Sequence, residues 1–365
     1  MKLRYFIGIV LGLGLIALGL GLRFAPAIAF SLALAVPSSE VWLEHFFQEP
    51  AREEIVIPAN GRALYANLYR PANPRGAILL VHGLSRAGRS HAELMRLARL
   101  LAQHGQLVLV PEFDGLTALR LSGQEVDEIK AGLLHLGGLA RNVGIAGFSF
   151  GAGPALLAAR DLPNVRLVGS FGGYADLRHV IAYITTGVHT FGGRRYVQRQ
   201  EEYNRWKLLA LFVAFVENER DRGFLQAIAD RKLANPSEPT DALEAALGEE
   251  GRNVVALILN RREDAVGPLL ARLPPRAREA LDRLSPLAAM SRLSGRLLIA
   301  HGAGDDSIPF TESLRLAEAS GGRARVVILQ TFHHTGPQRF WTSLGPRVRD
   351  GWNLLRLVDD LLATP

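Results

Sequence analysis

The sequence predicts an α/β fold: a mostly parallel sheet flanked by helices, with a helical insertion and an N-terminal transmembrane helix. From Glu53 onward, short β-rich runs alternate with helical stretches, the pattern of a parallel sheet covered by helices. The alternation stops near Asp176 and resumes only at Leu297, which indicates an insertion. Ahead of the first strand, residues 5–22 carry no charge.

The sheet is expected to begin with a hairpin. Ile55–Ile57 and Leu64–Tyr69 flank Asn60-Gly61, a pair typical of a tight hairpin turn. Further strands are short apolar runs closed by Gly, Pro or His, expected at Ala77–Val81, Leu107–Val110, Val143–Ala146, Leu167–Ser170, Leu297–Ala300 and Arg325–Leu329. Helices are expected between them over residues 91–103, 123–137 and 150–161.

The chain divides into three parts on this pattern. Residues 1–36 form an anchor or signal segment, residues 53–176 and 291–365 form the α/β core, and residues 177–290 form the insertion. The insertion is expected to be helical without a strand, with helices at Trp206–Val216, at Asp241–Leu247 and, after the Pro274-Pro275 break, up to Leu284. Trp206–Val216 is apolar nearly all round and too short to span a bilayer, so it either forms a buried core or dips into a membrane surface.

The N-terminal segment resembles a membrane anchor. Lys2 and Arg4 precede the uncharged run from Tyr5 to Leu22, and about 20 apolar residues cross a bilayer as a helix. Beyond Arg23, apolar residues continue to residue 36, so the span can extend further. The positive-inside rule then places the rest of the chain on the extracytoplasmic side.

Cleavage of this segment is the alternative, and it would make the protein secreted. Two triplets, Ala27-Ile28-Ala29 and Ala33-Leu34-Ala35, offer the small residues of a signal-peptide cleavage site. The hydrophobic stretch is longer than an ordinary signal core, which favours a retained anchor.

Composition excludes several functions. The net charge is +7, but no cluster of Lys and Arg with interleaved aromatics is present, so nucleic-acid binding is not expected. The chain has no cysteine, which excludes disulfides, a thiol nucleophile and thiolate metal ligands. Any chemistry must come from Ser, His and carboxylates. Composition does not indicate an oligomeric state.

The strongest motif is Gly147-Phe148-Ser149-Phe150-Gly151, between an expected strand and an expected helix. In a nucleophile elbow the strand-to-helix turn is so tight that glycines are needed two residues before and after the serine. The context therefore makes Ser149 a candidate nucleophile, with Gly147 and Gly151 as the elbow glycines.

With this motif, the chain from about residue 53 onward resembles the α/β-hydrolase superfamily. Leu80-Val81-His82-Gly83-Leu84 is similar to the segment that ends the third strand in that family. By this resemblance the backbone N–H groups of Leu84 and Phe150 form the oxyanion hole, and His82 shapes the loop. The insertion resembles the helical lid of these enzymes.

The acid and the base follow from the same resemblance. The segment Leu297 to Pro309 is similar to the family's HGxxDxxVP motif and implies Asp305 as the acid, with Asp306 as the alternative. The base is implied after the last strand, where His334 is preferred and His333 is the alternative. The order Ser, Asp, His is the one this superfamily uses. The two histidines do not suggest a metal site, because adjacent imidazoles point apart and no H-E-x-x-H lies nearby.

These residues predict a serine hydrolase that cleaves a carboxylic ester or related acyl bond through an acyl-enzyme, without a cofactor or a metal. The expected substrate is a small-molecule or lipid-like acyl compound. A peptidase or an acyltransferase using the same triad is the alternative, and a non-catalytic binding protein of the same fold is the other.

Overall fold

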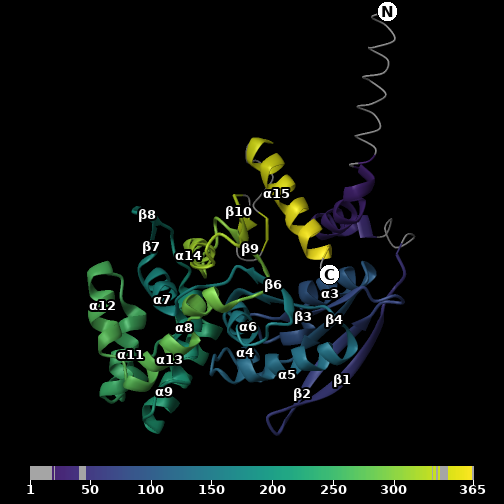
Figure 1. Cartoon of the computed structure of the whole chain (residues 1–365). Helices are drawn as coiled ribbons and strands as arrows, with labels where there is room; N and C mark the ends of the chain where they lie inside the picture. Colours follow the sequence, from purple (N-terminus) through teal and green to yellow (C-terminus); the bar gives the residue numbers. More distant parts are fainter. Residues whose placement is uncertain are drawn as a thin grey trace, which may run out of the picture.

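Eight strands form one sheet, in the spatial order β1 (Ala51–Ala59), β2 (Arg62–Arg70), β4 (Gln106–Pro111), β3 (Gly76–Val81), β5 (Val143–Phe148), β6 (Val165–Phe171), β9 (Arg296–Gly302) and β10 (Ala324–Leu329) (Figure 1). β2 runs antiparallel to both β1 and β4, and the other neighbouring pairs are parallel. The predicted α/β fold with a mostly parallel sheet is confirmed. Asn60 and Gly61 turn the β1–β2 hairpin at φ values of 48° and 77°.

The computed structural model describes residues 19, 21–40, 47–330, 332–333, 336–337 and 344–363, with the backbone alone for residues 37, 332–333, 336–337 and 344–347. Helices outside the insertion are α3 (Ala92–Gln103), α4 (Asp114–Thr117), α5 (Gln124–Leu139), α6 (Ala152–Ala159), α14 (Thr311–Ala319) and α15 (Leu344–Leu362). An unlabelled helix near the N-terminus covers residues 21–35.

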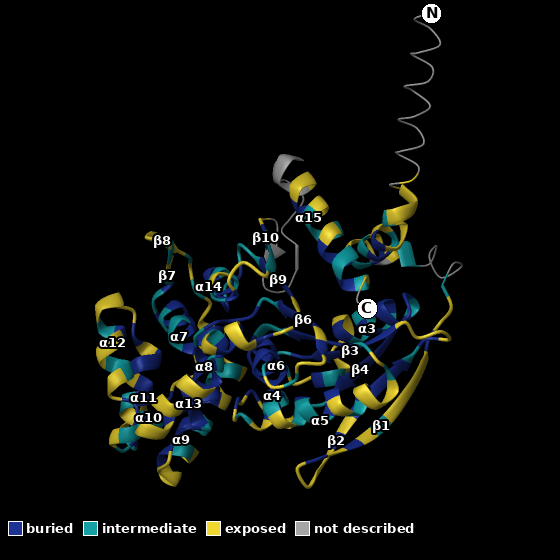
Figure 2. Cartoon of the chain, in the orientation of Figure 1, coloured by how far each residue is buried: buried dark blue, intermediate teal, exposed yellow. Residues whose placement is uncertain are grey.

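Successive side chains of the central strands face opposite layers, as the pleat of a strand requires. In β3, Leu79 and Val81 pack in the core beneath α5 and α6, whereas Ile78 and Leu80 pack in the core with α3 and α15. Both faces of the sheet are therefore covered, and its central strands are buried (Figure 2).

The insertion lies between β6 and β9 and is mainly helical. It contains α7 (Leu177–Thr186), β7 (Val188–Phe191), β8 (Arg194–Val197), α8 (Glu202–Val213), α9 (Glu219–Ala234), α10 (Asp241–Ala245), α11 (Glu249–Leu259), α12 (Glu263–Ala271), α13 (Pro275–Leu284) and the 3-10 segment η4 (Pro286–Arg292). The expectation that it has no strand is wrong. β7 and β8 form a hairpin around Gly192 and Gly193, both with positive φ, and this Gly-Gly pair was the sequence signal for it.

The apolar helix α8 forms the core of the insertion. Its side chains from Leu208 to Val213 are all buried, and it packs against α7, α9 and α11. The alternative in which this helix dips into a membrane surface is therefore wrong, because its apolar surface is already covered by protein.

The helix over residues 21–35 packs on the α/β core. Ala27, Phe30 and Ala33 repeat every three residues and are buried in the same core as α3 and α15. Arg23 donates two hydrogen bonds to Asp359 of α15, at 2.5 and 2.9 Å. The expectation that a membrane span continues beyond Arg23 is therefore corrected, because these apolar residues cover the core.

None of the helices in the described part of the chain is both long and apolar enough to cross a bilayer. Most of the run predicted to do so, Tyr5 to Leu22, lies outside the described residues.

Candidate active site

Ser149 occupies the turn between β5 and α6. Its φ is +52°, in the left-handed region that costs a non-glycine residue about 1–3 kcal/mol. The turn is tight on both sides: a Cβ on Gly147 would lie 2.5 Å from Cα of Ala152, and a Cβ on Gly151 would lie 2.1 Å from the carbonyl oxygen of His82. Glycine is therefore required at both positions, as the sequence motif predicts for a nucleophile elbow.

The loop after β3 lies directly against Ser149. A Cβ on Gly83 would be 2.9 Å from Cβ of Ser149. His82 is buried, its Nε2 accepts from the N–H of Phe113 at 3.2 Å, and its Nδ1 therefore carries the proton donated to the carbonyl of Gly83 at 2.8 Å. Burial lowers the pKa of His82, which favours this neutral form. His82 is thus bound into the loop by both ring nitrogens.

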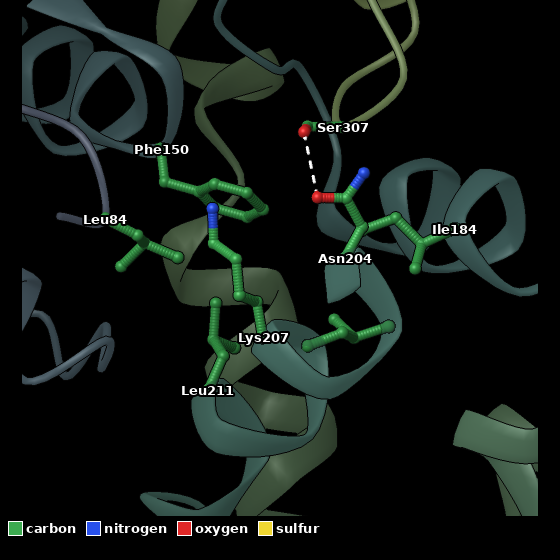
Figure 3. A pocket seen from close by; sticks show the side chains of 8 residues that line it. Leu84, Phe150, Ile184, Asn204, Lys207, Leu211 and Ser307 are labelled. Carbon is green, nitrogen blue, oxygen red and sulfur yellow. Dashed lines mark hydrogen bonds between the residues drawn. The ribbon is translucent and has the colours of Figure 1, made fainter. Parts of the chain in front are cut away.

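Two backbone N–H groups are available beside the serine. That of Leu84 has no hydrogen-bond partner among the described residues. That of Phe150 lies in the first turn after the elbow, where leading N–H groups have no acceptor within the helix. The side chains of both residues also line one small cavity beside α8, seen in Figure 3.

Asp305 follows β9, with β6 as the single strand between β9 and β5. Its Oδ1 accepts from the N–H groups of Ser307 and Ile308, each at 2.9 Å, and its Oδ2 lies 3.2 Å from Nε2 of His301. The side chain is buried (2% exposed), whereas Asp306 is only partly buried. The carboxylate of Asp305 is therefore fixed within the loop.

The insertion holds in place the loop that follows β9 and carries Asp305, named the acid loop below. The hydroxyl of Tyr183 and the side-chain amides of Gln198 and Asn204 donate to the backbone carbonyls of residues 305, 304 and 306, at 2.6, 2.9 and 3.1 Å. Ser307 also donates to the amide oxygen of Asn204 at 3.1 Å, as Figure 3 shows. Sequence reasoning missed these positioning residues, which lie about a hundred residues from the loop they hold.

The segment with the two histidines begins near the acid loop. β10 ends at Leu329, which pairs with Gly302 of β9, so the chain leaves the sheet beside the loop of Asp305. His333 lies in β11 (Phe332–His333), which pairs with β12 (Gly336–Pro337) and contacts β9. His334 and the side chain of His333 lie outside the described residues.

Lys207 is a further candidate residue that the sequence did not single out. It extends from α8 into the small cavity between Leu84 and Phe150 (Figure 3), and it also lines a larger cavity that reaches Ser149. Burial lowers its pKa, while Asp306 and Asp305 act in the opposite direction. The chain has four lysines, and a lysine inside the otherwise apolar run Trp206–Val216 was the available signal.

No group of three or more His, Cys, Asp or Glu side chains suited to a metal ion occurs in the described part of the chain.

Comparison with solved structures identifies the fold. A Bacteroides ovatus protein described as a dipeptidyl aminopeptidase IV matches 87% of this chain and 36% of its own length, with 15% identity and a TM-score of 0.50. At this identity the likeness shows the fold alone. The chain therefore has the α/β-hydrolase fold, as the resemblance of its motifs implies.

Two further structures are similar at lower TM-scores. A puromycin-hydrolysing peptidase from Mycobacterium tuberculosis matches 86% of this chain with 18% identity and a TM-score of 0.49, and this chain spans about two fifths (39%) of its length. An esterase domain of a Rhodothermus marinus protein matches 86% of this chain and 97% of its own, with 16% identity and a TM-score of 0.46. No protein-family model and no curated protein matches the sequence.

Proposed function

We propose that this protein is a serine hydrolase that cleaves a carboxylic ester or a related acyl bond. The observation that carries the proposal is the backbone at Ser149: a left-handed serine on a strand-to-helix turn, between two glycines that cannot be replaced without backbone clashes. A strained backbone of this kind persists only where the surrounding structure enforces it, and such positions cluster at active sites.

In the proposed reaction, Oγ of Ser149 attacks the substrate carbonyl while His334 accepts the hydroxyl proton. The N–H groups of Leu84 and Phe150 donate to the oxyanion, and removal of one such donor costs about 100- to 1,000-fold in kcat in known hydrolases. Asp305 orients the imidazole and stabilises its charged form. The protonated base then gives its proton to the leaving alcohol, and water hydrolyses the acyl-enzyme in the second half.

Labelling with a fluorophosphonate tests the nucleophile. We expect folded protein to be modified at Ser149, located by peptide mass spectrometry, and the Ser149→Ala variant to remain unlabelled. Hydrolysis of nitrophenyl butyrate should be lost in the same variant. Folded protein that neither labels nor hydrolyses this ester would favour the non-catalytic binding protein.

Single substitutions distinguish the two histidines and the two aspartates. We expect His334→Ala and Asp305→Ala to lower kcat by several orders of magnitude, because residues of a triad act as one unit. His333→Ala and Asp306→Ala are the matched controls and should retain most of the activity. The reverse pattern would transfer the role to the neighbour.

Amide substrates distinguish an esterase from a peptidase. The Bacteroides ovatus and Mycobacterium tuberculosis proteins are described as peptidases, so aminoacyl nitroanilides should be assayed beside the nitrophenyl esters. We expect ester hydrolysis to be at least 100-fold faster in kcat/KM. Comparable rates on both would favour the peptidase.

A further inference from the structure

A cavity of about 570 Å³ extends from Ser149 and Lys207 of the insertion to the helices on the α3 side of the sheet. This volume is within the range of small-molecule sites, about 300–1,000 Å³. Ser149, His82 and Lys207 contribute to its wall, and so do residues of α3, α15 and the helix over residues 21–35. The cavity therefore connects the proposed nucleophile with the layer of helices on the α3 side of the sheet.

The helical part of the wall is aliphatic and aromatic. Phe30 and Leu34 come from the helix over residues 21–35, Leu94 and Leu97 from α3, and Leu354 and Leu361 from α15. His91 and Glu93, which also line the cavity, are exposed side chains at its rim. A ligand in the helical part is thus met by hydrocarbon, and burial of apolar surface there is the available driving force.

The N-terminal wall is held by specific contacts. Besides the Arg23 to Asp359 ion pair, the rings of Phe24 and Trp352 lie 6.1 Å apart. At the other end of the helix, Arg96 of α3 donates to the carbonyls of Ala33 and Leu34. The last carbonyls of a helix receive no hydrogen bond from within the helix, and basic side chains commonly donate to them. The helix is therefore fixed to α15 at its first turn and to α3 at its last turn.

We propose that this cavity binds the linear aliphatic chain of a long-chain carboxylic ester, with the helix over residues 21–35 as one wall. This inference rests on the proposed function. The ester group lies at Ser149, and the chain extends between α3, α15 and the N-terminal helix. The substrate class is thus esters with long unbranched chains, and the determinant of chain length is the N-terminal helix rather than the insertion.

Chain-length profiles of the full-length protein test the proposal. Nitrophenyl butyrate, octanoate and dodecanoate, assayed below their critical micelle concentrations, vary the acyl chain, and ethyl and octyl acetate vary the alcohol. We expect kcat/KM to rise tenfold or more with length in one of the two series, which identifies the part of the ester that occupies the cavity. A flat profile in both series would overturn the proposal.

Substitutions on the N-terminal helix locate the chain. Leu34→Trp, which adds bulk at the cavity wall, should lower kcat/KM for the long ester about tenfold and leave the short ester within twofold. Leu32→Trp is the matched control, because Leu32 is exposed on the same helix, and it should change neither. Leu354→Trp on α15 repeats the test from the opposite wall. Equal loss with short and long esters would contradict the assignment.

Direct binding separates this inference from the catalytic proposal. In Ser149→Ala, the fluorescent fatty acid cis-parinaric acid should bind, and adding Leu34→Trp should weaken its binding about tenfold while adding Leu32→Trp should not. Binding without ester hydrolysis by the wild type would retain the cavity and refute the hydrolase. Hydrolysis of short esters without binding of parinaric acid would retain the hydrolase and refute the cavity.

Discussion

The backbone conformation of Ser149 depends on the two glycines beside it. Three non-glycine residues of the described chain have left-handed φ values, and one of them, Asn60, simply turns a hairpin. Ser149, in contrast, is not part of a hairpin turn. Its conformation is imposed by the contact of Gly147 with α6 and of Gly151 with the loop after β3.

We therefore expect Gly151→Ala to destabilise the fold and to abolish labelling of Ser149. The new methyl group would meet a backbone oxygen at 2.1 Å, and relief requires a backbone shift costing about 3 kcal/mol. Chemical denaturation measures the stability change, and fluorophosphonate labelling measures access to the serine.

Gly138→Ala in α5 is the matched control. Its added Cβ meets no atom within 4 Å, and alanine in a helix is favoured over glycine by about 0.5–1 kcal/mol. This variant should be as stable as the wild type or slightly more so. Wild-type labelling of Gly151→Ala would contradict the tight elbow.

Among the elements, α7 and α8 of the insertion act on the site through the acid loop. Tyr183 and Asn204 bind successive carbonyls of the loop that carries Asp305. The loop itself has the short-range bonds that Asp305 makes to the N–H groups of Ser307 and Ile308. The insertion therefore adds the contacts that fix the loop relative to the rest of the molecule.

We expect Asn204→Leu to lower kcat about tenfold with KM within twofold. The variant removes the donor to the carbonyl of residue 306 and leaves the hydroxyl of Ser307 with the carboxylate of Asp306, at 3.3 Å, as its acceptor. A tenfold loss corresponds to about 1.4 kcal/mol in the barrier. Steady-state kinetics on nitrophenyl butyrate measures the effect. Tyr203→Phe on the exposed side of the same helix should retain wild-type kinetics, and a pure KM effect in Asn204→Leu would refute the positioning role.

The hairpin of β7 and β8 makes stability depend on pH. His189 of β7 is buried against Tyr196, Tyr183 and Phe310, and burial lowers its pKa from 6.5 to about 4, with Glu312 opposing. Between these values the unfolded chain binds the proton and the folded chain does not. The contribution of neutral His189 to the free energy of unfolding is therefore fully present above pH 6.5. It is lost as the pH falls toward 4, and the loss is at most about 3 kcal/mol.

We expect His189→Phe to remove this loss, so that its stability relative to the wild type improves between pH 6.5 and 4. Urea unfolding at several pH values measures the difference.

Glu128 gives the opposite slope: burial, aided by Glu125 and Asp114, raises its pKa from 4.5 to about 7. Its contribution is present below pH 4.5 and is lost as the pH rises toward 7. Glu128→Gln should therefore improve relative stability at pH 7, and parallel curves for either variant and the wild type would contradict the assignment.

At the scale of the whole molecule, the packed N-terminal helix bears on how the chain is processed. Cleavage at Ala27-Ile28-Ala29 or at Ala33-Leu34-Ala35 would remove most of the helix and expose the apolar faces of α3 and α15 that it covers. This packing favours retention of residues 21–35, because the helix belongs to the α/β core.

We expect the full chain to remain with membranes after alkaline carbonate extraction, and a variant starting at residue 21 to be released while keeping its esterase activity. Intact mass spectrometry of the full chain should show that residues 1–35 are retained. Recovery of the full chain in the soluble fraction, or a mass that begins after Ala29 or Ala35, would contradict a retained anchor.

Sequence patterns by themselves determined the sheet, the position of its hairpin and the elbow at Ser149. These features depend on alternation, periodicity and turn chemistry within a few residues, so they can be predicted from short segments. The same reasoning missed the β7–β8 hairpin, although Gly192-Gly193 has the glycines that such a turn needs.

Only the tertiary structure decided that residues 21–35 form a wall of the cavity at Ser149, that Lys207 lies between Leu84 and Phe150, and that the insertion holds the acid loop. Arg23 and Asp359 are 336 residues apart, and Tyr183 and Asp305 are 122 apart. Nothing in a local pattern specifies such partners. They are fixed by how the helices pack on the sheet, where close packing decides which side chains meet.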